Sequence, residues 1–99
     1  MSETSASIAA WAETTFGPAT DLTVLSRRAR QELDELEDAL RAGESAEAVR
    51  EAADVVILLH RVCALLGSDL DAAVNAKMQV NRARRWRLSG DGVGQHEHD

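Results

Sequence analysis

The sequence predicts an all-α fold, a four-helix-bundle-like domain in a single segment of chain. Hydrophobic residues make up 44% of the chain, yet its only aromatics are Trp11, Phe16 and Trp86, so the core must consist of Ala, Leu, Val and Ile. One proline and few internal glycines leave long stretches without helix breakers. Apolar residues recur at helical spacing in these stretches, and 99 residues are enough for one small core.

Four helices are expected, with glycines between them. They cover approximately residues 5–15, 21–42, 45–66 and 68–87. The separating glycines are Gly17, Gly43 and Gly67. Ser68 and Asp71 form a capping-box-like start for the fourth helix. Residues 1–88 are therefore the predicted all-α domain, and residues 89–99 are predicted to be a flexible, glycine-rich C-terminal tail.

The predicted helix at 45–66 is apolar almost all round. One apolar stripe includes Val49 and Val56, and another includes Val55 and Val62. A helix of this kind is buried on more than one side. The other helices of so short a chain are too few to cover both sides, so we expect a homodimer or a homotetramer.

Two pairs of carboxylates with the same spacing are the main candidates for a functional site. Glu32 and Glu35 form one pair, and Glu51 and Asp54 form the other. Spacing of i, i+3 on a helix projects both side chains of a pair to nearly the same side, and two helices joined by a short loop can bring all four together. Such a cluster requires divalent cations, for which all-oxygen ligands favour Mg²⁺ or Mn²⁺, and it is suited to binding phosphate. The alternative is a set of surface acids that pair with neighbouring arginines.

Three polar residues of the last predicted helix are candidate phosphate ligands. Lys77, Asn81 and Arg84 are spaced i, i+4, i+7 and share a stripe with apolar residues, so they face the bundle. A lysine and a forked arginine suit the phosphate oxygens that a metal leaves uncompensated. The alternative is that these side chains only extend from the edge of the bundle into solvent.

Composition argues against several other classes of protein. The formal charge of −6 argues against duplex nucleic acid as the main partner. The lone Cys63 excludes an intramolecular disulfide and is expected to be a buried structural thiol, while His60 is expected to be a hydrogen-bonded core histidine. No apolar stretch reaches the roughly 20 residues that cross a bilayer, so we expect a cytoplasmic protein without a membrane partner.

These motifs together resemble the MazG-type all-α nucleoside triphosphate pyrophosphohydrolases. Glu32-Leu-Asp-Glu35 and, fifteen residues later, Glu51-Ala-Ala-Asp54 are similar to the Glu-x-x-Glu and Glu-x-x-Asp signature of that family. The resemblance implies that all four carboxylates are catalytic residues and ligands of Mg²⁺, with Mn²⁺ as a possible substitute. It further implies that one of the first pair, or another nearby acid, deprotonates the attacking water.

The later motifs extend the resemblance to a small single-domain branch of phages and bacteria. The run from Lys77 to Trp86 is similar to the family's Lys-x-x-x-Asn helix with a trailing arginine. The resemblance implies that Trp11 and Phe16 help to form the nucleobase pocket, although core packing is the alternative for each. It also implies that a terminal segment closes over the nucleotide, with His96 as the possible contact.

The predicted function is therefore Mg²⁺-dependent hydrolysis of a (deoxy)nucleoside triphosphate to the monophosphate and pyrophosphate, in the control of nucleotide pools. Two alternatives remain. One is a non-catalytic helical interaction module, and the other is a nucleic-acid accessory protein that uses the basic strip at 81–87.

Overall fold

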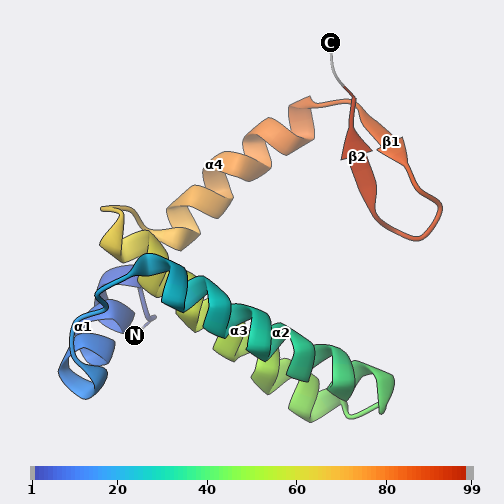
Figure 1. Cartoon of the computed structure of the whole chain (residues 1–99). Helices are drawn as coiled ribbons and strands as arrows, with labels where there is room; N and C mark the ends of the chain where they lie inside the picture. Colours follow the sequence, from blue (N-terminus) through green and yellow to red (C-terminus); the bar gives the residue numbers. More distant parts are fainter. Residues whose placement is uncertain (1, 98–99) are drawn as a thin grey trace.

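The computed structural model describes residues 2–97, which form four helices followed by a short antiparallel hairpin (Figure 1). The elements are α1 (Ser5–Phe16), α2 (Leu22–Arg41), α3 (Ser45–Leu65), α4 (Leu70–Ala83), β1 (Trp86–Leu88) and β2 (Gly94–His96). The predicted all-α, four-helix fold is confirmed, and the first three helices begin and end within one residue of their expected bounds.

Local capping explains where α2 begins and ends. The Asp21 side chain accepts a hydrogen bond from the Thr23 backbone N–H at 2.9 Å, which satisfies a free donor of the first turn. Gly43 follows the helix with a φ of 72°, a left-handed conformation that glycine adopts without strain. The turn between residues 41 and 45 is therefore short, and α2 and α3 run side by side in opposite directions (Figure 1).

The core is small and rich in alanine. Helix α3 packs along α2 on one side and against α1 on another. The buried hydrophobic residues are Ile8, Ala12, Leu25, Ala29, Ala39, Ala48 and Val55. Four of these seven side chains are single methyl groups, so the helix backbones approach closely.

Helix α4 leaves this core after contact with the end of α3 (Figure 1). None of its residues is buried. The expectation that it reaches Arg87 was wrong, because Arg84 is extended with a ψ of 154° and the Trp86 indole donates a hydrogen bond to the Asn81 carbonyl at 2.8 Å. Its N-cap is also Asp69 rather than the expected Ser68, since the Asp69 carboxylate accepts from the Ala72 N–H at 3.1 Å.

A buried polar network joins the start of α1 to the α3–α4 junction. Ser5 is fully buried, and its hydroxyl lies 2.7 Å from Nδ1 of His60 and accepts a hydrogen bond from the Leu70 N–H at 2.7 Å. The Ser5 N–H donates to the Asp69 carboxylate at 3.0 Å, and this bond lowers the pKa of Asp69. His60 is thus a hydrogen-bonded core histidine, as predicted.

The chain continues after α4 into the β1–β2 hairpin. Trp86 pairs with His96 and Leu88 with Gly94. The Trp86 and His96 rings also meet edge to face at 6.1 Å. Residues 89–97, expected as part of a flexible tail, here form the turn and the second strand. Their flexibility and the division of the chain at residue 88 stay predictions. Residues 98 and 99 of the expected tail lie outside the described part.

Many large apolar side chains of the described residues remain at the surface. On α3 they include Val49, which is 69% exposed, and Val56; on α4 they include Val74 and Met78. Cys63, expected to be buried, is only partly so. None of the described helices combines the length and hydropathy needed to cross a bilayer. The expected homodimer or homotetramer stays a prediction, for which these exposed faces provide the apolar surface.

Candidate metal centre and adjacent groove

Three of the four predicted metal ligands form one cluster between α2 and α3. Glu32 and Glu35 lie one turn apart on α2, and Glu51 faces them from α3. One carboxylate oxygen from each can be chosen so that all three atoms lie within 4.8 Å of one another. Glu32 is buried with 7% of its surface exposed, Glu51 is half-buried and Glu35 is exposed. The i, i+3 spacing of Glu32 and Glu35 and the packing of α3 against α2 thus bring three acids together.

The cluster holds more negative charge than it can keep ionised by itself. Hydrogen bonding with the Glu32 carboxylate is the main effect that raises the pKa of Glu51 to about 8, and hydrogen bonding with Glu47 acts in the same direction. Hydrogen bonding and charge from Glu32 also raise the pKa of Glu35. The pKa of Glu32 is lowered, because Glu35 and then Glu51 can donate to its carboxylate and Arg28 pairs with it at 3.2 Å. Protons therefore occupy positions that cations can take.

The donor set fits a hard divalent cation. All three groups offer carboxylate oxygens, the ligands that Mg²⁺ and Mn²⁺ prefer. Oε2 of Glu51 is buried and has no hydrogen-bond donor among residues 2–97. A buried oxygen without a donor is costly, and a cation would compensate it.

Asp54, the fourth predicted ligand, lies outside this tight cluster. It is exposed and lies one turn beyond Glu51 on α3. Its side chain lines a groove that Glu32 also lines. Glu32 therefore links the cluster to Asp54, and the assignment of Asp54 as a ligand stays a prediction.

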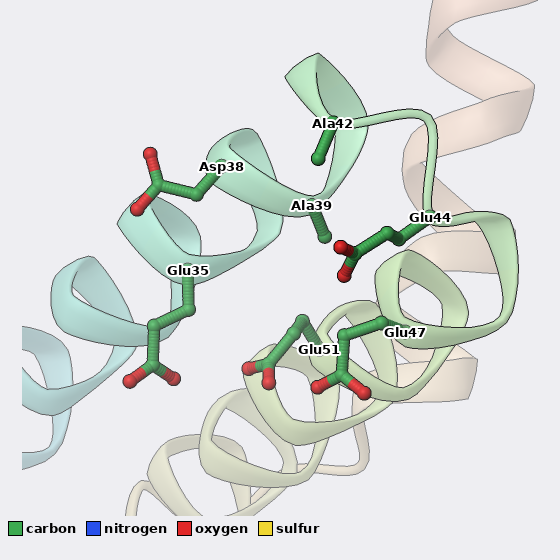
Figure 2. A pocket seen from close by; sticks show the side chains of 7 residues that line it. All are labelled: Glu35, Asp38, Ala39, Ala42, Glu44, Glu47 and Glu51. Atoms are coloured by element: carbon green, nitrogen blue, oxygen red, sulfur yellow. The ribbon is translucent and has the colours of Figure 1, made fainter.

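Glu47 is an acid near the site that the sequence patterns did not single out. Glu35 on α2 and Glu47 and Glu51 on α3 line a hollow of about 430 Å³ between the helices. Figure 2 shows these side chains, with Asp38 turned away from them. Hydrogen bonding from Arg50, at 2.5 Å, and then from Glu51 lowers the pKa of Glu47. Its position four residues before Glu51 was the signal that could have identified it.

A second groove, of about 470 Å³, begins at Glu32 and Asp54 and extends toward α1. Its lining residues are Trp11, Phe16, Arg28, Glu32, Asp54, Ile57, Leu58 and Arg61. Trp11 and Phe16 meet edge to face at 5.4 Å and are 55% and 66% exposed, so neither is a core residue. Both predicted nucleobase contacts thus lie in one groove beside the carboxylates.

The predicted phosphate ligands are not brought to this site within one chain. Lys77, Asn81 and Arg84 lie on or just after α4, which points away from the α2–α3 pair, and none of them lines either groove (Figure 1). Lys77 is exposed, and the Asn81 side-chain oxygen is buried without a partner in the described chain. His96 lies on β2, where it contacts Trp86. The roles of these four residues stay predictions.

Fold and site together define an all-α protein with a cluster of three carboxylates between two antiparallel helices. No family model matches the chain. The chain is similar to the solved structure of the Cyanophage S-2L MazG-like pyrophosphohydrolase bound to dGDP and three catalytic Mn²⁺ ions per active site. The TM-score is 0.73, and the sequences are 32% identical, with 95% of this chain and 93% of that one covered. The chain therefore belongs to the MazG-like pyrophosphohydrolases, as the resemblance predicted.

Two curated relatives are named dATP/dGTP diphosphohydrolase. The protein of Salmonella phage PMBT28 is 38% identical over 91 residues, which are 90% of this chain and 29% of that protein. The protein of Cyanophage S-2L is 40% identical over 57 residues, which are 58% of this chain and 54% of that protein. This chain thus matches about a third of one curated relative and about half of the other.

Proposed function

We propose that this chain is a metal-dependent deoxynucleoside triphosphate pyrophosphohydrolase that acts on dATP or dGTP. The products would be the monophosphate and pyrophosphate, a reaction suited to the control of nucleotide pools. The observation that carries the proposal is the convergence of Glu32, Glu35 and Glu51 within 4.8 Å, with the pKa of Glu51 raised to about 8. The names of the curated relatives supply the substrate class.

Glu32, Glu35, Glu51 and Asp54 would hold Mg²⁺, with Mn²⁺ as a substitute. The Mn²⁺ ions of the structural relative support a divalent ion of this type. Such ions supply charge neutralisation at the phosphates and lower the pKa of a bound water. The carboxylates would position the attacking water against the α-phosphorus, and one of them would accept its proton. Glu47, four residues before Glu51, is placed to orient the Glu51 carboxylate.

The groove beside the cluster would hold the nucleoside. The exposed rings of Trp11 and Phe16 offer apolar faces on which a base can stack. Because Asp54 and Glu32 line the same groove, a base in it would leave the phosphates near the carboxylates.

A second copy of the chain would supply the phosphate ligands. Lys77, Asn81 and Arg84 lie away from the carboxylates of their own chain, on or just after a helix without buried residues. Exposed apolar side chains on α3 and α4 offer the surface for a homodimer or homotetramer. In such an assembly these three residues would meet the phosphates of a nucleotide held by the partner, and His96 would be a further contact from the terminal hairpin.

A substrate panel tests the activity. Each deoxynucleoside triphosphate is incubated with Mg²⁺ or Mn²⁺, and monophosphate and pyrophosphate are quantified by chromatography. We expect both products in equal amounts, in a reaction that EDTA abolishes. Release of orthophosphate would contradict the proposed bond cleavage, and absence of any hydrolysis would favour the non-catalytic helical module.

A mixing experiment tests the shared site. Glu51→Gln and Lys77→Ala chains, each expected to be weakly active alone, are unfolded together and refolded. If the phosphates are bound across the interface, mixed oligomers contain one site with neither substitution, and activity rises above that of either variant. Activity that stays at the level of the separate variants would place Lys77 and Glu51 in the same chain's site.

A further inference from the structure

Arg61 is a cation that neither the carboxylate cluster nor the core uses. It lies on α3, seven residues after Asp54, and is half-buried. Its guanidinium carbon lies 5.7 Å from the centroid of the Phe16 ring, a cation–π contact. Within the described chain it has no carboxylate oxygen inside 4.0 Å, whereas Arg28 in the same groove is paired with Glu32 at 3.2 Å. Arg61 therefore retains its hydrogen-bonding capacity for a ligand.

Arg61 lies too far along α3 to contact the phosphates of a nucleotide that is bound at the carboxylates. Arg61 follows Glu51 by ten positions on α3, which corresponds to about 15 Å along the axis at 1.5 Å per residue. Ile57 and Leu58 line the groove between the acids and Arg61. Arg61 also lines a neighbouring hollow with Phe16 and Leu25, and neither Glu32 nor Asp54 lines that hollow. A nucleotide whose phosphates meet the carboxylates would thus present its base, not its phosphates, to Arg61.

We propose that Arg61 is a specificity-determining residue that selects guanine. Its guanidinium would donate two parallel hydrogen bonds to O6 and N7 of the base, while the contact with the Phe16 ring keeps the guanidinium in place. Adenine presents an acceptor at N7 but an amino donor at N6, which cannot pair with a second arginine donor. This inference rests on the proposed function, because that function puts the base in this groove.

Base analogues test the two contacts individually. Equilibrium binding of dGMP, dAMP, dIMP and 7-deaza-dGMP is measured by calorimetry with Mn²⁺ present, for the unaltered protein and for Arg61→Ala. We expect dGMP and dIMP, which share O6 and N7, to bind about tenfold to a hundredfold more tightly than dAMP. The 7-deaza analogue, which lacks N7, should bind several-fold more weakly than dGMP. In Arg61→Ala these differences should disappear.

Two further variants separate recognition from stability. Arg61→Lys keeps a positive charge near Phe16 but loses the planar fork, so it should fold normally and still lose the preference for guanine. Arg30→Ala removes an exposed arginine of α2 that lines neither groove, and it should retain the full preference. Thermal unfolding of each variant verifies that the fold is retained.

The outcomes distinguish the two proposals. Equal weakening of all four nucleotides by Arg61→Ala would show that Arg61 contacts a common part of the nucleotide, and the guanine assignment would be wrong. Equal binding of dGMP and 7-deaza-dGMP by the unaltered protein would overturn it as well. Hydrolysis of triphosphates that persists in either case leaves the proposed function intact, whereas failure of every nucleotide to bind would overturn both proposals.

Discussion

Replacing Glu51 by Gln should change catalysis and stability in opposite directions. Glutamine keeps the size of the side chain but removes the charge that Glu32 and Glu47 oppose. It also removes a metal ligand from a cluster whose oxygens lie within 4.8 Å. We expect kcat to fall at least about a hundredfold, the range observed when a charge-stabilising group is removed from a transition state.

The effect on stability depends on pH, and its sign follows from the pKa of Glu51. An unfolded chain has the ordinary value of 4.5, and the folded protein without metal has a value of about 8. Between these values the folded state binds about one more proton at this site than the unfolded state, so its stability falls as pH rises through this window. The raised pKa of Glu35 acts in the same direction. Glu51→Gln should therefore unfold at a higher temperature than the unaltered protein at pH 8 without metal.

Thermal unfolding with and without Mg²⁺ or Mn²⁺ measures both effects. Metal ions that bind only the folded state should raise the midpoint of the unaltered protein, most strongly at pH 8, and raise that of Glu51→Gln much less. Glu37→Gln, on the outer part of α2 where Glu37 pairs with Arg41, is the matched control and should behave like the unaltered protein. A Glu51→Gln protein with full activity, or one destabilised at pH 8 without metal, would refute the reasoning.

Three further predictions concern residues around the site. Lys77→Ala or Arg84→Ala should lower kcat/KM for every triphosphate by similar factors, because all substrates present the same phosphates; a base-selective loss, measured with the substrate panel, would contradict this assignment. Ser5→Ala should lower the free energy of unfolding by about 1–3 kcal/mol, because the buried His60 and the Leu70 N–H lose their partner; denaturant titration measures it, and a neutral effect would show that water replaces the hydroxyl. Sedimentation at micromolar concentration should show a dimer or a larger species, and a stable, active monomer would contradict the role given to the exposed faces of α3 and α4.

The sequence was sufficient to predict most of the helices and the centre of the site. Asp21, Gly43 and the helical spacing of apolar residues determine local structure, so α2 could be bounded without tertiary information. The i, i+3 spacing likewise places Glu32 and Glu35 on one side of α2, whatever packs there. Convergence with Glu51 followed because the loop between the helices is short and fixes their pairing.

Features that depend on contacts between distant segments were not predicted. The exposure of Asp54 depends on how α1 and α2 pack against α3, because the groove that Asp54 lines also contains residues of both helices. The end of α4 depends on the Trp86 indole bonding back to Asn81, and the hairpin depends on pairing between Trp86 and His96. Arg61 was overlooked for the same reason, because its contact with Phe16 joins two helices.

The alanines between α2 and α3 have a consequence for ion selectivity. Ala39 and Ala48 are each only 5% exposed, and Ala39 lines the same hollow as Glu35 and Glu51. Their methyl groups set the separation of the helices and hence the span over which carboxylate oxygens from both can reach one ion. Mg²⁺ requires oxygens at about 2.1 Å, whereas Ca²⁺ accepts about 2.3–2.6 Å and more ligands. A larger residue at Ala39 would widen the gap, so a core position without any charge can shift the preference of the site from the smaller ion to the larger one.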